Sequence, residues 1–242
     1  MAVGTLAVGL LFIAGTFMTG IFLATVSTER TIAAVAADEA FAKVRLFGLD
    51  LGDPNLTTTG FLPYQPDVSM AAQEYLYPSI VDPCASQYSW AALCKRVSDT
   101  SRLAEVTVFV SRRVGTHGRY WVRQADAAQA LEESDLPRPV RVQVEQDAAA
   151  QGTDELQIVD AVPGDNVDEN GFIDDGSTLV CDGTGHIYRV LERYADRPDV
   201  IRLDRPWEEP DPAAVWVIPP PVSGGRNPFV AVYQRVLRFE AE

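Results

Sequence analysis

The first 28 residues of the chain carry no charged side chain, and the residues that follow keep a helical pattern of apolar positions. Charged residues appear from Glu29 onward, but the apolar positions still recur with a period near 3.6 residues, and no proline occurs before Pro54. This pattern predicts one continuous helix over residues 4–47. At about 1.5 Å per residue, such a helix would be a rod roughly 65 Å long.

The uncharged run is long enough to cross a membrane, because about 20 consecutive apolar helical residues span the hydrocarbon core of a bilayer. We therefore expect residues 1–28 to be a transmembrane anchor, and the amphipathic part after Glu29 to be a stalk for a soluble head. A secretory signal peptide would have a basic start and an apolar core of about 7 to 15 residues. Here the start is uncharged and the apolar run is about twice that length, so a signal peptide fits less well than an anchor. Alternative interpretations are a plain signal anchor for an unrelated periplasmic domain and a wholly buried globular helix.

Two adjacent runs carry a family resemblance. The apolar run LAVGLLFIAGTFMTGIFLATVST is punctuated by Gly, Ala and Thr, and the amphipathic run ERTIAAVAADEAFAKVRLFG follows it. Together they resemble the N-terminal stalk of type IV pilins and of type II secretion pseudopilins, over about the first 48 residues. One departure is Thr5, which stands nearest to the position where that family has an acidic residue.

The resemblance implies a fold and a function. The expected fold class is α+β, with a long transmembrane and stalk helix packed on an antiparallel sheet, followed by a second small all-β module. The expected function is that of a minor pilin or pseudopilin, a structural subunit of a type IV pilus or of a type II secretion-like filament. Its partners would be other pilin-like subunits, bound through the N-terminal helix, and the bacterial inner membrane, with the head in the periplasm or outside the cell.

In the rest of the chain, residues at alternate positions form the period-two patterns typical of β-strands. Residues 88–93 and 104–110 predict two antiparallel strands joined by VSDTSR, and residues 137–147 predict another strand. Between them, DAAQALEESD at residues 126–135 predicts a short helix. We expect the apolar stripe of the stalk to pack on the strand pair around Val106 and Phe109, because a narrow stripe needs cover from a sheet.

The pattern of the C-terminal part predicts a separate β-rich module. A small, polar segment at residues 146–153 suggests a boundary, and six short apolar runs follow it with turn residues between them. That spacing predicts a small barrel or sandwich, which the final run at residues 229–239 would close. The expected division is a transmembrane and stalk helix at 1–48, a pilin-like head at 49–147 and a β-rich module at 152–242.

Charge and motifs exclude several function classes. The 242 residues include 34 Asp and Glu against 20 Lys and Arg, a net charge of −14, which disfavours a nucleic acid partner. The two histidines, His117 and His186, lie outside any H-E-x-x-H motif, and no Walker or G-x-S-x-G motif occurs. The segment DGTG at 182–185 is best explained as a hairpin turn. We therefore expect no enzyme activity, and the sequence identifies no small-molecule substrate.

One stretch, DNVDENGFIDD at residues 165–175, has a recognisable ligand pattern. With Asn166 as the first ligand, oxygen-bearing side chains fall at alternate positions and Gly171 falls at the tight turn. The stretch thus resembles the first two-thirds of an EF-hand or dockerin calcium loop. Ser177 replaces the bidentate glutamate of such loops, which predicts weak binding. The predicted calcium ligands, which include a backbone oxygen from Phe172, are Asn166, Asp168, Asn170, Phe172, Asp174 and Asp175. The alternative is a polar hairpin turn.

The three cysteines leave several pairings open. Cys84 and Cys94 lie ten residues apart and would close a short loop in an exported protein, whereas Cys94 with Cys181 would tie two domains together. The third possibility is free buried thiols. For the function itself, the alternative to a filament subunit is a stand-alone membrane-anchored extracytoplasmic binding protein that forms no filament, with calcium as its candidate cofactor.

Overall fold

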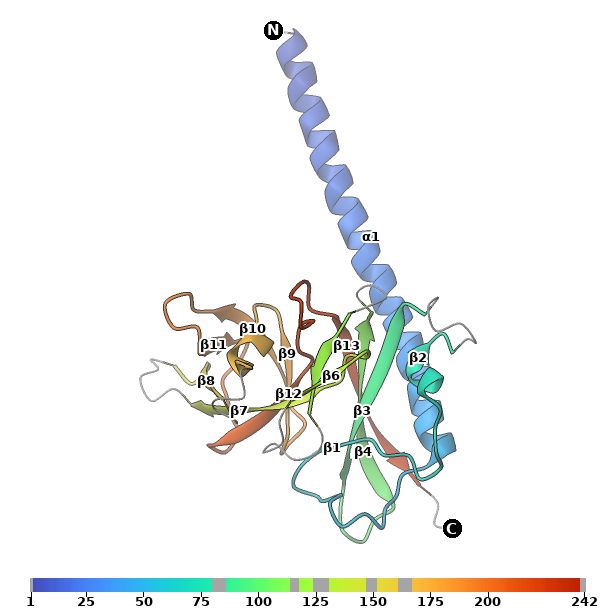
Figure 1. Cartoon of the computed structure of the whole chain (residues 1–242). Helices are drawn as coiled ribbons and strands as arrows, with labels where there is room; N and C mark the ends of the chain where they lie inside the picture. The colour runs from blue at the N-terminus through green and yellow to red at the C-terminus, as the bar shows by residue number, and fades with distance from the viewer. Residues whose placement is uncertain are drawn as a thin grey trace.

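A long N-terminal helix projects from a β-rich body (Figure 1). The computed structural model describes residues 2–79, 86–113, 118–123, 131–146, 152–160 and 167–239. Helix α1 runs from Ala2 to Phe47 without a break, as the sequence predicts, and at about 1.5 Å per residue it is roughly 70 Å long. The free end of α1 and the C-terminal end of the last described strand, β13 (Phe229–Arg238), lie at opposite ends of the molecule (Figure 1).

The second half of α1 packs on a sheet, and its ending has a simple cause. Its buried face consists mainly of alanines, which allow the strands to approach the helix closely: Ala33, Ala36, Ala37, Ala40, Phe41 and Val44. The helix ends at Phe47, and Gly48 follows with a φ of 73°. This left-handed conformation suits glycine because glycine has no Cβ, and it commonly terminates helices.

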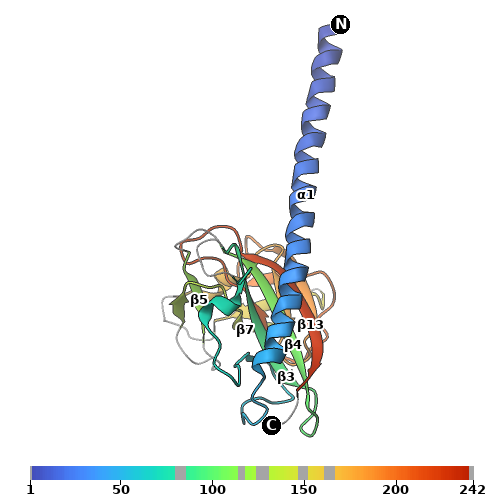
Figure 2. The same ribbon diagram turned by 90° about the vertical axis from the view of Figure 1, so that its right-hand side faces the viewer.

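The sheet beneath α1 has five antiparallel strands in the order β1, β3, β4 and β13, with β2 also paired to β3. Their bounds are Leu62–Pro63 for β1, Leu76–Tyr77 for β2, Tyr88–Arg96 for β3, Leu103–Arg112 for β4 and Phe229–Arg238 for β13. The turn at residues 97–102 joins β3 to β4, which confirms the predicted hairpin. Figure 2 shows the lower half of α1 lying along β3, β4 and β13.

Alternate residues of β4 face opposite sides of this sheet. Val106, Val108 and Val110 belong to the core that includes the alanines of α1, as expected for the stalk stripe. Phe109 was expected there as well, but it lies in a separate core with Leu93 on the other side of the sheet. That expectation was wrong for Phe109 because successive side chains of a strand point to opposite faces.

The second β unit is a closed barrel with the strand order β10, β11, β8, β7, β12 and β9. Its strands span Val140–Gln146 for β7, Glu155–Val159 for β8, Thr178–Cys181 for β9, Ile187–Arg193 for β10, Val200–Leu203 for β11 and Ala213–Val217 for β12. Alternate residues fill its interior, among them Val142, Leu156, Leu179, Tyr188, Ile201 and Val215. Of the barrel or sandwich predicted from the strand spacing, the barrel is therefore present.

Two strands pair differently from the expected division of the chain. Strand β7 was expected in the head, but it pairs with β8 and β12 in the barrel. Strand β13 was expected to close the C-terminal module, but it pairs along its whole length with β4 in the head sheet. The strands on either side of the expected boundary, β7 and β8, thus pair with each other in the barrel, as strands adjacent in sequence often do. The chain leaves the head sheet, completes the barrel and returns for the last strand.

Smaller elements complete the body. Strands β5 (Tyr120–Val122) and β6 (Glu132–Ser134) form a two-stranded ribbon, and two short 3-10 helices, η1 and η2, span Ala72–Tyr75 and Glu169–Phe172. The helix expected at 126–135 is replaced by β6 over its described part, and residues 126–130 lie outside the described residues.

The barrel covers the face of the head sheet that α1 leaves open. A shared apolar core joins Phe61, Leu93 and Phe109 of the head to Val180, Trp216 and Ile218 of the barrel. Polar contacts reinforce it, because Lys95 Nζ donates to the carbonyl oxygen of Gly183 at 2.8 Å. The body is thus three layers, with the helix on one side of the sheet and the barrel on the other (Figure 1).

Candidate functional site

The N-terminal half of α1 stands clear of the body and exposes large apolar side chains. Phe12 is 73% exposed and Phe22 is 63% exposed, and Phe17, Met18, Ile21 and Leu23 are exposed as well. Within the part of α1 whose side chains the structure describes, Gly15–Phe47 is long and apolar enough to cross a membrane. Water would hydrate this apolar surface at a large free-energy cost, so the rod needs either lipid or other helices around it.

Ionic contacts fix α1 to the head near the point where it leaves the body. Arg112 Nη1, at the end of β4, lies 3.0 Å from Glu29 Oε1. Further along the helix, Arg235 of β13 lies 2.6 Å from Asp38 and above the ring of Phe41. These contacts come from two different strands, so the emerging rod has a defined direction relative to the sheet.

Lys43 makes the most buried of these contacts. Its Nζ lies 2.7 Å from Glu39 Oε1 and 3.0 Å from Glu74 Oε2, and it donates to the carbonyl oxygen of Glu74 and to Ser79 Oγ. Glu74 belongs to η1 in the loop after the helix. A buried ammonium ion is tolerated only when it is paired and hydrogen-bonded, so Lys43 holds this loop against the helix.

Several oxygens of the predicted calcium loop already have protein partners, whereas the buried Oδ1 of Asn170 has none among the described residues. Asp168 caps η2, because its Oδ1 accepts a hydrogen bond from the N–H of Asn170 at 3.0 Å. The side chain of Phe172 is buried in the barrel core. Asn166 lies outside the described residues. Within the part of the chain that the structure describes, no group of three or more His, Cys, Asp or Glu side chains is placed to hold a metal.

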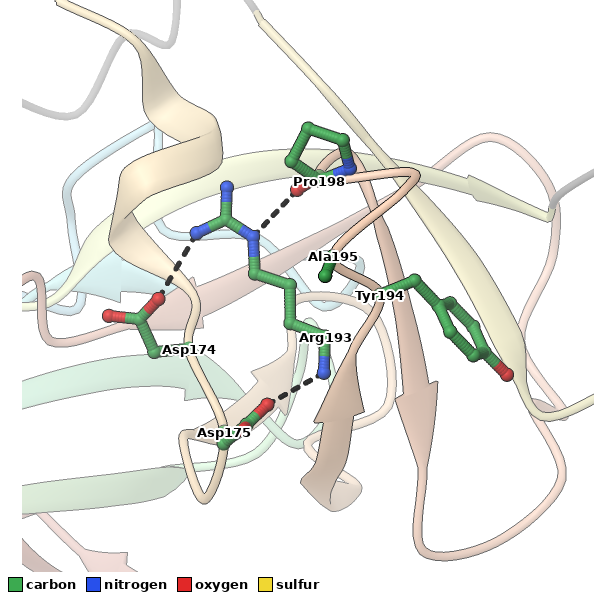
Figure 3. A pocket seen from close by; sticks show the side chains of 6 residues that line it. All are labelled: Asp174, Asp175, Arg193, Tyr194, Ala195 and Pro198. Carbon is green, nitrogen blue, oxygen red and sulfur yellow. Dashed lines mark hydrogen bonds and ion pairs between the residues drawn. The ribbon is translucent and has the colours of Figure 1, made fainter.

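Asp174 and Asp175 instead meet an arginine. Asp174 Oδ1 lies 3.1 Å from Arg193 Nη1, and Asp175 Oδ1 accepts the backbone N–H of Arg193 at 2.6 Å. Arg193 Nε also donates to the carbonyl oxygen of Pro198, at 2.7 Å. These residues, with Tyr194 and Ala195, line an open hollow of about 400 Å³ (Figure 3). A calcium ion at Asp174 would have to compete with the guanidinium of Arg193, and one at Asp175 with the backbone N–H of Arg193, so calcium binding here stays a prediction.

A buried polar cluster in the barrel surrounds Glu209, a residue that no sequence motif marks. Glu209 Oε1 accepts from Thr184 Oγ1 at 2.6 Å, lies 2.7 Å from His186 Nδ1 and accepts from Tyr188 OH at 3.2 Å. Burial disfavours the charged form, but hydrogen bonds from Thr184 and His186 outweigh it and hold the pKa of Glu209 below its ordinary value. The carboxylate thus anchors the 204–212 loop to the turn at 182–185.

A second buried ion pair joins the ribbon to the barrel. Arg123 follows β5 and pairs through Nη2 with Glu169 Oε1 in η2, and both side chains are almost fully buried. Arg123 Nη1 also donates to the carbonyl oxygen of Arg141 at 3.2 Å. The two residues are 46 positions apart, and although Glu169 lies within the predicted calcium loop, that pattern does not include it among the ligands, so no local sequence signal could have paired it with Arg123.

The cysteines are free thiols where the structure describes them. Cys94 is buried on the face of β3 that packs against α1, and Cys181 is buried in the barrel core. The pairing of Cys94 with Cys181 is therefore wrong, because Cys94 faces the helix and the barrel lies on the other side of the sheet. The expected pairing of Cys84 with Cys94 involves a residue that the structure does not describe, Cys84. Burial raises the pKa of both described thiols, which keeps them unreactive.

Comparison with known proteins adds no family assignment, since no family model, curated protein or solved structure matches the chain. The functional argument therefore rests on the exposed rod, its attachment to the head and the polar clusters of the barrel.

Proposed function

We propose that this protein is a membrane-anchored structural subunit of the minor pilin or pseudopilin kind. The observation that carries the proposal is the single continuous helix, whose N-terminal part is an exposed apolar rod and whose C-terminal part packs on an antiparallel sheet. An uninterrupted helix transmits the position of its membrane half directly to the head, as a filament subunit requires.

The rod has features that suit packing against similar helices. Gly15 and Gly20 have no heavy atom within 4 Å of an added Cβ, so their surfaces are open to a neighbouring helix. Small residues allow helices in a membrane to approach closely. The partners in this proposal are other pilin-like subunits, and the head lies in the periplasm or outside the cell.

Two measurements test the proposal. First, the native protein should remain in the membrane fraction after carbonate washing; full release would overturn the anchor. Second, in a variant without native cysteines, a cysteine at Phe17 or Leu23 should form disulfide-linked dimers in the membrane. A cysteine at Leu191, which is exposed on the barrel, is the matched control and should stay monomeric.

The cross-linking result also separates the two function classes. Retention in the membrane together with dimers through Phe17→Cys supports the filament subunit. Retention without any dimer through either rod position would overturn it and support the stand-alone anchored binding protein. An impermeant thiol reagent applied to intact cells should label Leu191→Cys if the head is outside the cytoplasm.

A further inference from the structure

The end of the head sheet nearest the rod is fixed at the point where α1 leaves the body. Strand β3 begins there at Tyr88, β4 ends there at Arg112, and β13 begins there at Phe229. The N–H of Arg112 donates to the carbonyl oxygen of Pro228 at 2.8 Å, which ties the two strand ends together. The contact between Arg112 and Glu29 then fixes this end of the sheet to α1. Figure 1 shows the segment leading into β13 at the same end of the body as the emerging rod.

The position of the first charged residue places this end at a membrane surface if the rod is the anchor. Glu29 follows at least 28 residues with uncharged side chains, and about 20 such residues already span the hydrocarbon core of a bilayer. Glu29 would therefore lie at headgroup level, and its ion-pair partner Arg112 would lie there too, with no spacer between the membrane and the head.

This end of the head is rich in arginine. Arg30 and Arg226 are exposed, and Arg112 and Arg113 are half-buried. The turn that carries Arg226 is held to the start of β13, because Asn227 Oδ1 accepts a hydrogen bond from the N–H of Phe229 at 2.9 Å. Residues 221–228 contain no acidic residue. Glu29, the acidic residue described beside Arg112, is already paired with it.

The acidity of the protein is concentrated elsewhere. Residues 140–217, which include all the barrel strands, hold 18 acidic and 6 basic residues, a net charge of −12. The rest of the chain holds 16 acidic and 14 basic residues, a net charge of −2. A chain with this overall negative charge is repelled by an anionic surface. The arginines at the end of the head nearest the rod make the charge of that end positive, opposite in sign to the rest of the protein.

We propose that this arginine-rich end, formed by Arg30, Arg112, Arg113 and Arg226, docks on the anionic phospholipid headgroups of the bilayer that holds the rod. The inference rests on the proposed anchoring of α1 and adds a lipid class and an orientation to it. Basic residues next to a membrane segment are attracted to anionic lipids within about a Debye length of the surface. Guanidinium groups also bind phosphate oxygens through two parallel hydrogen bonds. The acidic barrel would be kept away from the same surface.

The test uses the full chain reconstituted into vesicles of phosphatidylcholine alone or mixed with phosphatidylglycerol. A fluorophore on Ser223→Cys, in a variant without native cysteines, reports on the docking end through quenching by a nitroxide on the lipid headgroups. A fluorophore on Val97→Cys, in the turn at the other end of β3, is the reference probe. We expect at least twofold stronger quenching at position 223 in the anionic vesicles, decreasing as salt is added, and no difference at position 97.

Charge reversal supplies the matched control. Arg30→Glu combined with Arg226→Glu should remove the difference between the two lipid mixtures. Arg45→Glu combined with Arg238→Glu makes the same change in charge at the far ends of α1 and β13, where both arginines are exposed, and should leave the difference intact. Neither pair includes Arg112, so the contact with Glu29 is preserved in both.

The outcomes separate this inference from the proposed function. Quenching at position 223 that is equal in the two lipid mixtures, or that survives reversal of Arg30 and Arg226, would overturn the docking while leaving the anchor in place. Release of the unmodified chain from both kinds of vesicle by carbonate would overturn the anchor itself.

Discussion

Asp182 of the barrel accepts a hydrogen bond from the backbone N–H of Phe61 in the head, at 2.9 Å through Oδ1. The same oxygen accepts from Trp216 Nε1 at 2.7 Å, and Oδ2 accepts from Arg141 Nε at 3.0 Å. One carboxylate at the end of β9 therefore connects the two β units and sets the position of a large core side chain. The barrel and the head sheet are joined by a specific polar contact as well as by apolar packing.

We predict that Asp182→Ala destabilises the whole chain by about 3 kcal/mol, because it leaves buried N–H donors without acceptors. The free energy of unfolding in urea, followed by tryptophan fluorescence in detergent micelles, measures this. Asp38→Ala is the control, since Asp38 and Arg235 form an exposed ion pair, which contributes about 1 kcal/mol or less. Equal losses from the two substitutions would contradict the role given to Asp182.

The last strand provides a second prediction, because two neighbouring residues face opposite sides of it. Leu237 is buried against the helix-facing core, whereas Val236 is 55% exposed. Leu237→Ala should cost about 2–5 kcal/mol of unfolding free energy, as for other buried leucines. Val236→Ala should cost about 0.5 kcal/mol or less. The same urea experiment measures both, and a small effect at Leu237 would argue against the pairing of β13 with β4.

The lowered pKa of Glu209 leads to a third prediction, that the free energy of unfolding depends on pH in a specific way. Its pKa is lower in the folded than in the unfolded state, so its contribution is present above about pH 4.3, the unfolded value. That contribution is lost as the pH falls through the folded pKa. Glu209→Gln should therefore lower the unfolding free energy by about 2 kcal/mol at neutral pH, the scale of hydrogen bonds to a charged group.

The pH series identifies the cause. The stability difference between the native chain and Glu209→Gln should shrink as the pH is lowered from neutral towards 3. Glu208→Gln changes the exposed neighbouring residue and should have little effect at any pH. A difference for Glu209 that stays constant over the whole series would show that packing, and not ionisation, explains it.

Calcium provides the fourth prediction. Excess calcium should raise the melting temperature of the chain relative to chelator, with a Kd of about 10⁻⁴ to 10⁻³ M, because the loop lacks the bidentate glutamate. At 100 times the Kd the gain would be about 2.7 kcal/mol. The ion has to compete with Arg193 for Asp174, and Asp174 is 59% exposed and accessible for such an exchange.

The matched variants for calcium follow from those contacts. Asp168→Ala combined with Asp174→Ala should abolish the shift in melting temperature. Asp204→Ala removes another exposed acceptor of the barrel, for the N–H of Arg189, and should leave the shift unchanged. Identical melting with calcium and with chelator in the native chain would leave residues 165–175 as a turn.

The candidate sites show where sequence reasoning worked and where it failed. The apolar rod was predictable because its signal is an unbroken run of uncharged residues. The cluster around Glu209 was missed, since its partners come from separate turns and the sequence gives no spacing rule for them. The carboxylates Asp174 and Asp175 were recognised as neighbours, but their contacts with Arg193 depend on how β10 passes beside the loop.

Local pattern by itself determined the helix from Ala2 to Phe47, the β3–β4 hairpin and the existence of the strands that form the barrel. Only the tertiary structure decided that β7 enters the barrel and that β13 returns to the head sheet. The physical reason is that alternation fixes which residues of a strand share a face, whereas its pairing partner depends on which distant surfaces remain to be covered. Strand β13 buries side chains against the α1-facing core and against the barrel-facing core, and neither surface exists until the rest of the chain has folded.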